Sequence, residues 1–162
     1  MSLNGKCKIF AAVILACALA IPALADTSAT LYLSGSVAKT ASISVVTASG
    51  ASSLNLLSTP PSAITVGTLS EICNSTTGYT VSVQSANGGS LKGAISGNTD
   101  SVAYTLYQNG TAVTLSATAT TMITASAKTS GTSQTLTIAY TGNSALAADV
   151  YSDTLTFTIA AL

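Results

Sequence analysis

Residues 151–162 read YSDTLTFTIAAL, and within them Leu155, Phe157 and Ile159 alternate with threonine. A period of two places these three apolar side chains on one face of an extended strand. We therefore expect a half-buried terminal strand here. An apolar strand edge invites pairing, so we expect its apolar face and its backbone to be covered by an earlier part of the chain or by another molecule.

The same alternation recurs through the rest of the chain. Residues 79–85 (YTVSVQS) and 134–140 (QTLTIAY) show it clearly, and no segment beyond residue 25 has a convincing helical period. Short strands at intervals of roughly 8 to 12 residues are typical of an immunoglobulin-like sandwich. We predict an all-β fold, an immunoglobulin-like antiparallel β-sandwich. The expected strands are 29–37, 41–45, 54–57, 64–72 with a kink at Gly67, 79–85, 102–108, 111–116, 121–125, 134–140 and one within 151–162.

The first two of these segments leave two arrangements open. Gly35 interrupts the apolar stripe of residues 29–37, and the alternation resumes at residues 41–45. A glycine inside a strand pattern marks a bulge or a close backbone approach. The segment therefore forms either two short strands or one strand preceded by an exposed extension.

A hairpin is predicted at Asn109-Gly110. This dipeptide tolerates the positive φ angles of a type I′ turn, which is the turn that matches the twist of paired strands. The resulting register places apolar residues opposite each other on one face. The expected cross-strand pairs are Gln108 with Thr111, Leu106 with Val113, and Tyr104 with Leu115.

The first 25 residues have the features of a secretory signal peptide. Lys6 and Lys8 precede an apolar run over residues 9–19, and Ala23-Leu24-Ala25 is a small-residue cleavage site before Asp26. We expect an exported, mature chain that forms one domain over residues 26–162 without a transmembrane segment. Two alternatives are a membrane anchor, which Pro22 interrupts, and a lipoprotein cleaved before Cys17.

The composition excludes several functions. The chain has five Lys and Arg residues together, five Asp and Glu residues, and no histidine or tryptophan. Without a basic face it cannot neutralise a row of phosphates, so nucleic acid is not an expected partner. Without a histidine base or an arginine clamp we expect neither an enzyme nor a cofactor. So few charges also argue against a freely soluble monomer.

Three further features have simple explanations. Cys73 is the single cysteine that remains after residue 25, and with no histidine to activate it we expect a buried, inert free thiol. Asp149 and Asp153 are four residues apart, but the other oxygen ligands of a calcium site are not evident. Asn74 and Asn109 match the glycosylation sequon, although a turn already explains Asn109.

Five segments of the chain have to be considered together. They are Ser36-Val37, Ala41-Ser42-Ile43-Ser44-Val45, Glu71-Ile72-Cys73-Asn74, Gly78-Tyr79-Thr80-Val81-Ser82-Val83 and Tyr151-Ser152-Asp153-Thr154-Leu155-Thr156-Phe157. In combination they resemble the spore coat protein U-like pilins of the archaic chaperone-usher system. The likeness covers most of the mature chain, and the closing Tyr-x-Asp-Thr-Leu-x-Phe strand is its most specific part.

The resemblance implies an immunoglobulin-like fold that lacks its last strand. A periplasmic chaperone would fill the groove first. The N-terminal extension of the next subunit would then replace it at an outer-membrane usher, giving a fibre at the cell surface. Such pilins commonly carry a disulfide from the first strand to mid-chain; Cys73 matches its second half, while the first half falls near Ala41, which is not cysteine.

Two hypotheses follow. In the first, the chain is a structural subunit of a surface fibre whose extension, about residues 26–34, is donated to a neighbour. Its donor-strand residues are Ala29, Leu31, Leu33 and Val37, and the receiving groove is bordered by Leu155, Phe157 and Ile159. In the second, the N-terminal strand folds onto its own sheet, and the chain is a self-contained surface or coat domain that binds carbohydrate or matrix.

Overall fold

The computed structural model describes residues 27–162, so the expected signal peptide lies outside the described residues. The chain divides into a unit that ends at Ser36 and a unit from Val37 to Leu162. Residues 27–40 contain no strand, and Leu31 and Leu33 are each 81% exposed. Of the two arrangements expected for residues 29–45, the structure has the single strand, preceded by an exposed segment.

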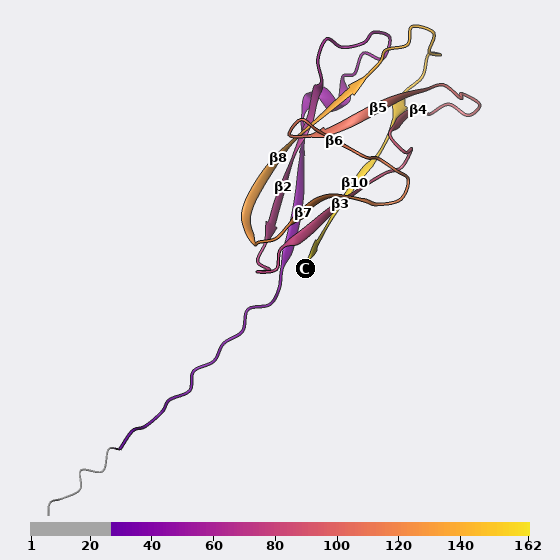
Figure 1. The fold of residues 1–162 in the computed structure, drawn as a ribbon. Helices are drawn as coiled ribbons and strands as arrows, with labels where there is room; N and C mark the ends of the chain where they lie inside the picture. Colours follow the sequence, from indigo (N-terminus) through magenta and orange to yellow (C-terminus); the bar gives the residue numbers. More distant parts are fainter. Residues whose placement is uncertain (1–26) are drawn as a thin grey trace, which may run out of the picture. The chain divides into compact units, whose positions relative to one another are not determined.

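The second unit is built from antiparallel strands in two sheets (Figure 1). The strands are β1 (Ala41–Thr47), β2 (Ile64–Cys73), β3 (Tyr79–Ser85), β4 (Ser90–Gly93), β5 (Ser101–Gln108), β6 (Thr111–Val113), β7 (Thr120–Ala125), β8 (Thr129–Tyr140), β9 (Tyr151–Ser152) and β10 (Leu155–Ala161), with a 3-10 turn η1 (Ser49–Ser52). The first sheet has the order β1-β2-β8-β5-β4-β9, with β6 paired to β5, and the second has the order β10-β3-β7. The predicted all-β, immunoglobulin-like sandwich is confirmed.

Local turn chemistry explains where the chain reverses. Asn109 has φ 46° and Gly110 φ 84°, as a type I′ turn requires, and Gln108 pairs with Thr111. Gly78, at φ 95°, ends the turn before β3, where an added Cβ would lie 1.8 Å from the Ala125 carbonyl oxygen. Only glycine fits that position. The predicted kink at Gly67 is present as a register shift in the β2–β8 ladder.

Three local predictions were wrong. Residues 54–57 form no strand; the segment lies in a loop. β6 ends at Val113, so the expected pair of Tyr104 with Leu115 does not form; the pairs Gln108 with Thr111 and Leu106 with Val113 do form. The third concerns the terminal segment, which is two strands in different sheets: β9 pairs with β4, and β10 pairs with β3.

The core lies between the two sheets. Alternate residues of β3 face inward, and Val81 and Val83 are fully buried. Leu69 of β2 and Leu106 of β5 meet them from the first sheet, also fully buried. The period-two pattern therefore identifies the inward face correctly on the central strands.

Candidate functional site

The two strands that border one side of the sandwich each have a single partner. Among the described residues, β1 is hydrogen-bonded only to β2, and β10 only to β3. β1 and β10 approach each other but belong to different sheets and form no ladder. We call these two strands, with their inward residues Ile43, Val45, Leu155, Phe157 and Ile159, the open edge.

On β1, residues on the core face are less covered than their partners. Val45 pairs directly with Leu69, so both side chains lie on the same face of the sheet. Leu69 is fully buried, whereas Val45 is 44% exposed. The core is therefore closed over β2 and open over β1.

The same contrast holds on β10. Phe157 pairs with Val83 and Ile159 pairs with Val81. Both valines are fully buried, while Phe157 and Ile159, like Leu155, are half-buried. The predicted groove residues thus line one side of the core, with no strand hydrogen-bonded beyond them in residues 27–162.

The predicted donor residues lie in and next to the N-terminal segment. Ala29, Leu31 and Leu33 belong to the exposed stretch before Ser36, and Val37 is 89% exposed at the start of the second unit. None of them contributes to the core cluster of the described chain.

An acid that the sequence reading did not single out lies in the core. Glu71 is fully buried and accepts a hydrogen bond from the Tyr79 hydroxyl at 2.7 Å, while its Oε1 atom has no hydrogen-bond partner in residues 27–162. Burial, reinforced by the bond to Glu71, raises the pKa of Tyr79 to about 12. The alternation of β2 was the available signal, because it places Glu71 on the same face as Leu69 and Cys73.

Cys73 is a buried free thiol at the end of β2, 1% exposed. Its sulfur accepts from the Ser75 amide at 3.5 Å. In register it lies opposite Ala41, which is the position where the resemblance places the first cysteine of a disulfide. The thiol also donates to the Gly78 carbonyl oxygen at 3.9 Å.

Asp149 and Asp153 have separate structural roles. Asp153 connects β10 to the core: its carboxylate accepts from the Ser85 hydroxyl at 2.6 Å and the Tyr104 hydroxyl at 2.7 Å. Asp149 accepts from the Ile95 amide and the Asn98 side chain, at 2.9 and 2.7 Å. Within residues 27–162 no group of three or more acids, cysteines or histidines is placed to hold a metal ion.

Both sequon asparagines are engaged in hydrogen bonds within the fold. The Asn74 side chain accepts from the Thr40 amide and donates to the Ala38 carbonyl, at 2.7 and 2.8 Å. The Asn109 side chain accepts from the Thr135 amide at 2.7 Å and donates to Gln134. Each amide thus has a structural use.

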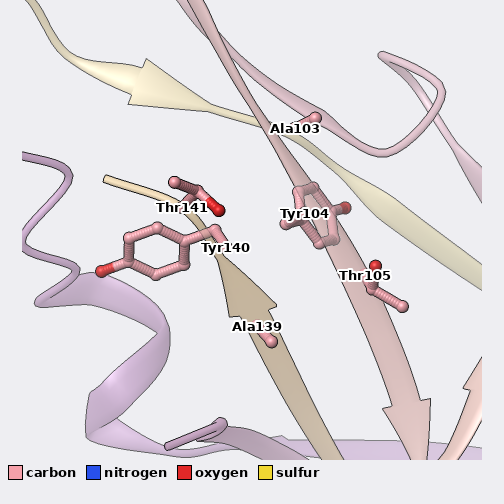
Figure 2. A pocket seen from close by; sticks show the side chains of 6 residues that line it. All are labelled: Ala103, Tyr104, Thr105, Ala139, Tyr140 and Thr141. Atoms are coloured by element: carbon pink, nitrogen blue, oxygen red, sulfur yellow. The ribbon is translucent and has the colours of Figure 1, made fainter. Parts of the chain in front are cut away.

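A shallow hollow of about 310 Å³ lies over β5 and β8, lined by residues 103–105 and 139–141 (Figure 2). The hydroxyls of its two tyrosines both donate hydrogen bonds within the fold. Tyr104 donates to Asp153, and Tyr140 donates to the Asn55 carbonyl at 3.1 Å. Both hydroxyls therefore help to hold the fold together at this hollow.

The comparisons with known proteins agree with this architecture. The family model described as the Spore Coat Protein U domain matches residues 27–158. No curated protein matches the chain. Within the described residues, no helix has the length and apolar character needed to cross a membrane.

Proposed function

Since the chain belongs to the Spore Coat Protein U domain family, a family of pilus-type surface subunits and not of enzymes, we propose that it is an exported structural subunit of a bacterial surface fibre. In the proposed assembly, the N-terminal segment of one copy adds as a strand to the open edge of another copy. This is β-strand addition, in which backbone hydrogen bonds give affinity and alternate side chains give specificity.

The observation that supports this proposal most directly is the unequal burial across the open edge. Val45 and Leu69 share a face, yet one is 44% exposed and the other is fully buried. An aliphatic side chain that faces the core but remains accessible to water does not gain the full favourable free energy of burial. A strand added beside β1 or β10 would recover it and would satisfy the unpaired edge.

The N-terminal segment has the pattern that such a strand needs. Leu31 and Leu33 are two residues apart, so they project from the same face of an extended strand. Burying each leucine fully contributes roughly 1.5–3 kcal/mol. Ala29 and Val37 lie on that face too, while Thr30, Tyr32 and Ser34 lie on the other.

An exported chain with an open core needs protection before assembly. We propose that a periplasmic chaperone covers the open edge in transit and that an outer-membrane usher exchanges it for the next subunit. The destination is then the cell surface or an extracellular fibre. The low content of charged residues, 6% of the chain, fits a protein that functions in an assembled state.

The test is a matched pair of variants in the donated segment. Leu33→Asp places a charge in the apolar core of the neighbour, a burial costly enough to prevent docking. Ser34→Asp places the same charge on the opposite face and should leave fibres intact. Electron microscopy of the cell surface and size-exclusion chromatography of the periplasmic fraction measure both.

We expect Leu33→Asp to accumulate as a soluble chaperone complex without fibres. A self-contained carbohydrate- or matrix-binding domain would respond differently to Leu33→Asp. The charge would then lie in the domain's own core, and the protein would unfold or be degraded. A wild-type protein that stays monomeric and stable without a chaperone would contradict the fibre proposal.

A further inference from the structure

Two of the three lysines in residues 27–162 lie at one end of the second unit. Lys39 and Lys128 line a hollow of about 510 Å³ together with Val37 and the loop 74–77. Both lysines are exposed, and Lys39 Nζ donates to the Leu162 carbonyl oxygen at 2.5 Å. We call this surface the lysine end.

Another hollow, of about 610 Å³, has acidic groups beside it. It is lined by apolar residues that include Leu54, Leu57 and Val150, and by Asp149. Leu57 is 58% exposed and Val150 is 71% exposed. Asp100 lies beside this hollow, because its carboxylate accepts from the amide of Ala147, a lining residue, at 2.8 Å. We call this surface the aspartate end.

The hydrogen bonds of Asp149 keep it charged. Desolvation alone would raise the pKa of its carboxyl, but bonds from the Ile95 amide, the Asn98 side chain and the Val150 amide outweigh it and hold the pKa below its ordinary value. The aspartate end therefore carries negative charge at neutral pH, beside exposed apolar side chains.

Strand β10 separates the two ends. Its first residue, Leu155, follows the segment from Asp149 to Asp153, and its last residue, Ala161, precedes Leu162 at the lysine end. Seven residues of strand span roughly 20 Å. In Figure 1, β4 lies at one end of the domain and the C-terminus at the other.

The proposed strand donation limits which ends can meet. Val37 and Lys39 directly follow the donated segment in the sequence. The lysine end of the donor copy must therefore lie next to the point where the donated strand leaves the acceptor copy. A donor antiparallel to β10 leaves at the aspartate end. A donor parallel to β10 leaves at the lysine end, which would bring Lys39 and Lys128 of two copies together, and like charges in contact are unfavourable.

We propose that in the fibre the lysine end of each copy docks on the aspartate end of the neighbouring copy that receives its strand. This inference rests on the proposed function and adds the surface that joins successive domains. Lys39 and Lys128 face Asp100 and Asp149, and Val37 packs against the apolar hollow. The contact is heterologous, with different surfaces on the two copies, as an open fibre requires.

Charge reversal tests the junction. Lys128 is exposed and makes no hydrogen bond to a described residue, so Lys128→Glu should leave the fold unchanged. Lys92→Glu is the matched control: Lys92 is also exposed, but it pairs with Ser152 near the aspartate end. We expect Lys128→Glu to slow assembly of the mature protein about tenfold at low salt, and Lys92→Glu to leave it as fast as wild type or faster.

A compensating change makes the test specific. Thr99 is exposed next to Asp100 and makes no side-chain hydrogen bond with a described residue. Thr99→Lys should therefore restore assembly of Lys128→Glu. The difference between wild type and Lys128→Glu should disappear at about 1 M salt, where the Debye length is about 3 Å.

A synthetic peptide of residues 27–37 separates this inference from the proposed function. The peptide fills the open edge but carries neither Lys39 nor Lys128, so its binding to wild type and Lys128→Glu should be equal. If the peptide does not bind at all, the proposed function is wrong. If it binds and fibres form at the same rate in wild type, Lys128→Glu and the Thr99→Lys double variant, the junction is wrong.

Discussion

Strands β3 and β10 are neighbours with the same sequence pattern and different surroundings. Both alternate apolar residues with threonine or serine, and they pair over their whole length. On β3, Val81 and Val83 are fully buried; on β10, their partners Ile159 and Phe157 are only half-buried. β3 has β7 on its other side, and β10 has no second partner in the described chain.

The difference shows that the alternation of apolar and polar residues determines which side chains face the core. How deeply those side chains are buried depends on how many neighbouring strands cover them. A central strand gains the full transfer free energy of its inward residues from the fold itself. An edge strand with an open side gains only part of it and leaves its backbone available for pairing with another molecule. The following predictions test that contrast, beginning with the largest expected effect.

The first compares two residues that face each other on β1 and β2. Leu69→Ala should lower the free energy of unfolding by about 2–5 kcal/mol, because it leaves a cavity in a closed part of the core. Val45→Ala, on the open edge, should cost less than about 1 kcal/mol in the free protein. Denaturant unfolding of freshly refolded protein at low concentration, before assembly, measures both.

Assembly should reduce this contrast. In the proposed fibre the donated strand would cover Val45, so the cost of Val45→Ala should rise while that of Leu69→Ala stays the same. Equal costs for the two variants in the monomer would mean that the edge is already closed.

The second prediction attaches β1 covalently to β2. Ala41 is opposite Cys73, and the adjacent pair is hydrogen-bonded through the Asn74 amide and the Thr40 carbonyl. Ala41 and Cys73 are therefore a non-hydrogen-bonded pair, with Cα atoms about 4.5 Å apart, which suits a disulfide. Ala41→Cys should form it in an oxidising compartment and stabilise the domain by roughly 2–4 kcal/mol.

The control for this disulfide is one residue away. Ser42→Cys projects from the opposite face of β1 and pairs with Ile72, so Cys73 should remain a free thiol in it. Thiol labelling under denaturing conditions, with and without reductant, distinguishes the variants. Free thiols in Ala41→Cys would contradict the register of β1 on β2.

The faces of the strands were predictable from sequence, and so was the hairpin. Both depend on local rules: period two for β3 and β8, and positive φ angles at Asn109-Gly110. The kink at Gly67 follows in the same way. These features need no knowledge of which strands become neighbours.

What could not be predicted depends on contacts distant in sequence. Residues 54–57 are apolar enough for a strand, but they form a loop whose backbone bonds elsewhere: Leu56 accepts from the Asn143 amide. The alternation in residues 151–162 does not show that β9 and β10 join different sheets. Glu71 lies at an inward position, and only the fold shows that the Tyr79 hydroxyl reaches it.

The last prediction concerns what holds β10 in place while one of its sides is open. Asp153 lies two residues before the strand and receives bonds from Ser85 and Tyr104 of β3 and β5. Burial alone would raise the pKa of this carboxyl, but these bonds, with those from the Asn87 and Thr154 amides, outweigh it and lower the pKa below its ordinary value. The charged form of Asp153 is therefore the stabilising one.

The sign of the pH dependence follows from that lowered pKa. The contribution of Asp153 is fully present above the pKa of an unfolded aspartate, about 3.9, and is lost as the pH falls through the lower folded value. Asp153→Asn should cost about 1–3 kcal/mol at pH 7, and the gap from wild type should shrink on acidification below about pH 4. Tyr140→Phe removes a hydroxyl that bonds a carbonyl and no acid, so its cost should not vary with pH. Suppose instead that the difference in free energy of unfolding between wild type and Asp153→Asn were the same at neutral and acidic pH, as expected for Tyr140→Phe. In that case the charged carboxylate would not be what holds β10 in place, and the apolar contacts with β3 alone would have to hold the edge strand.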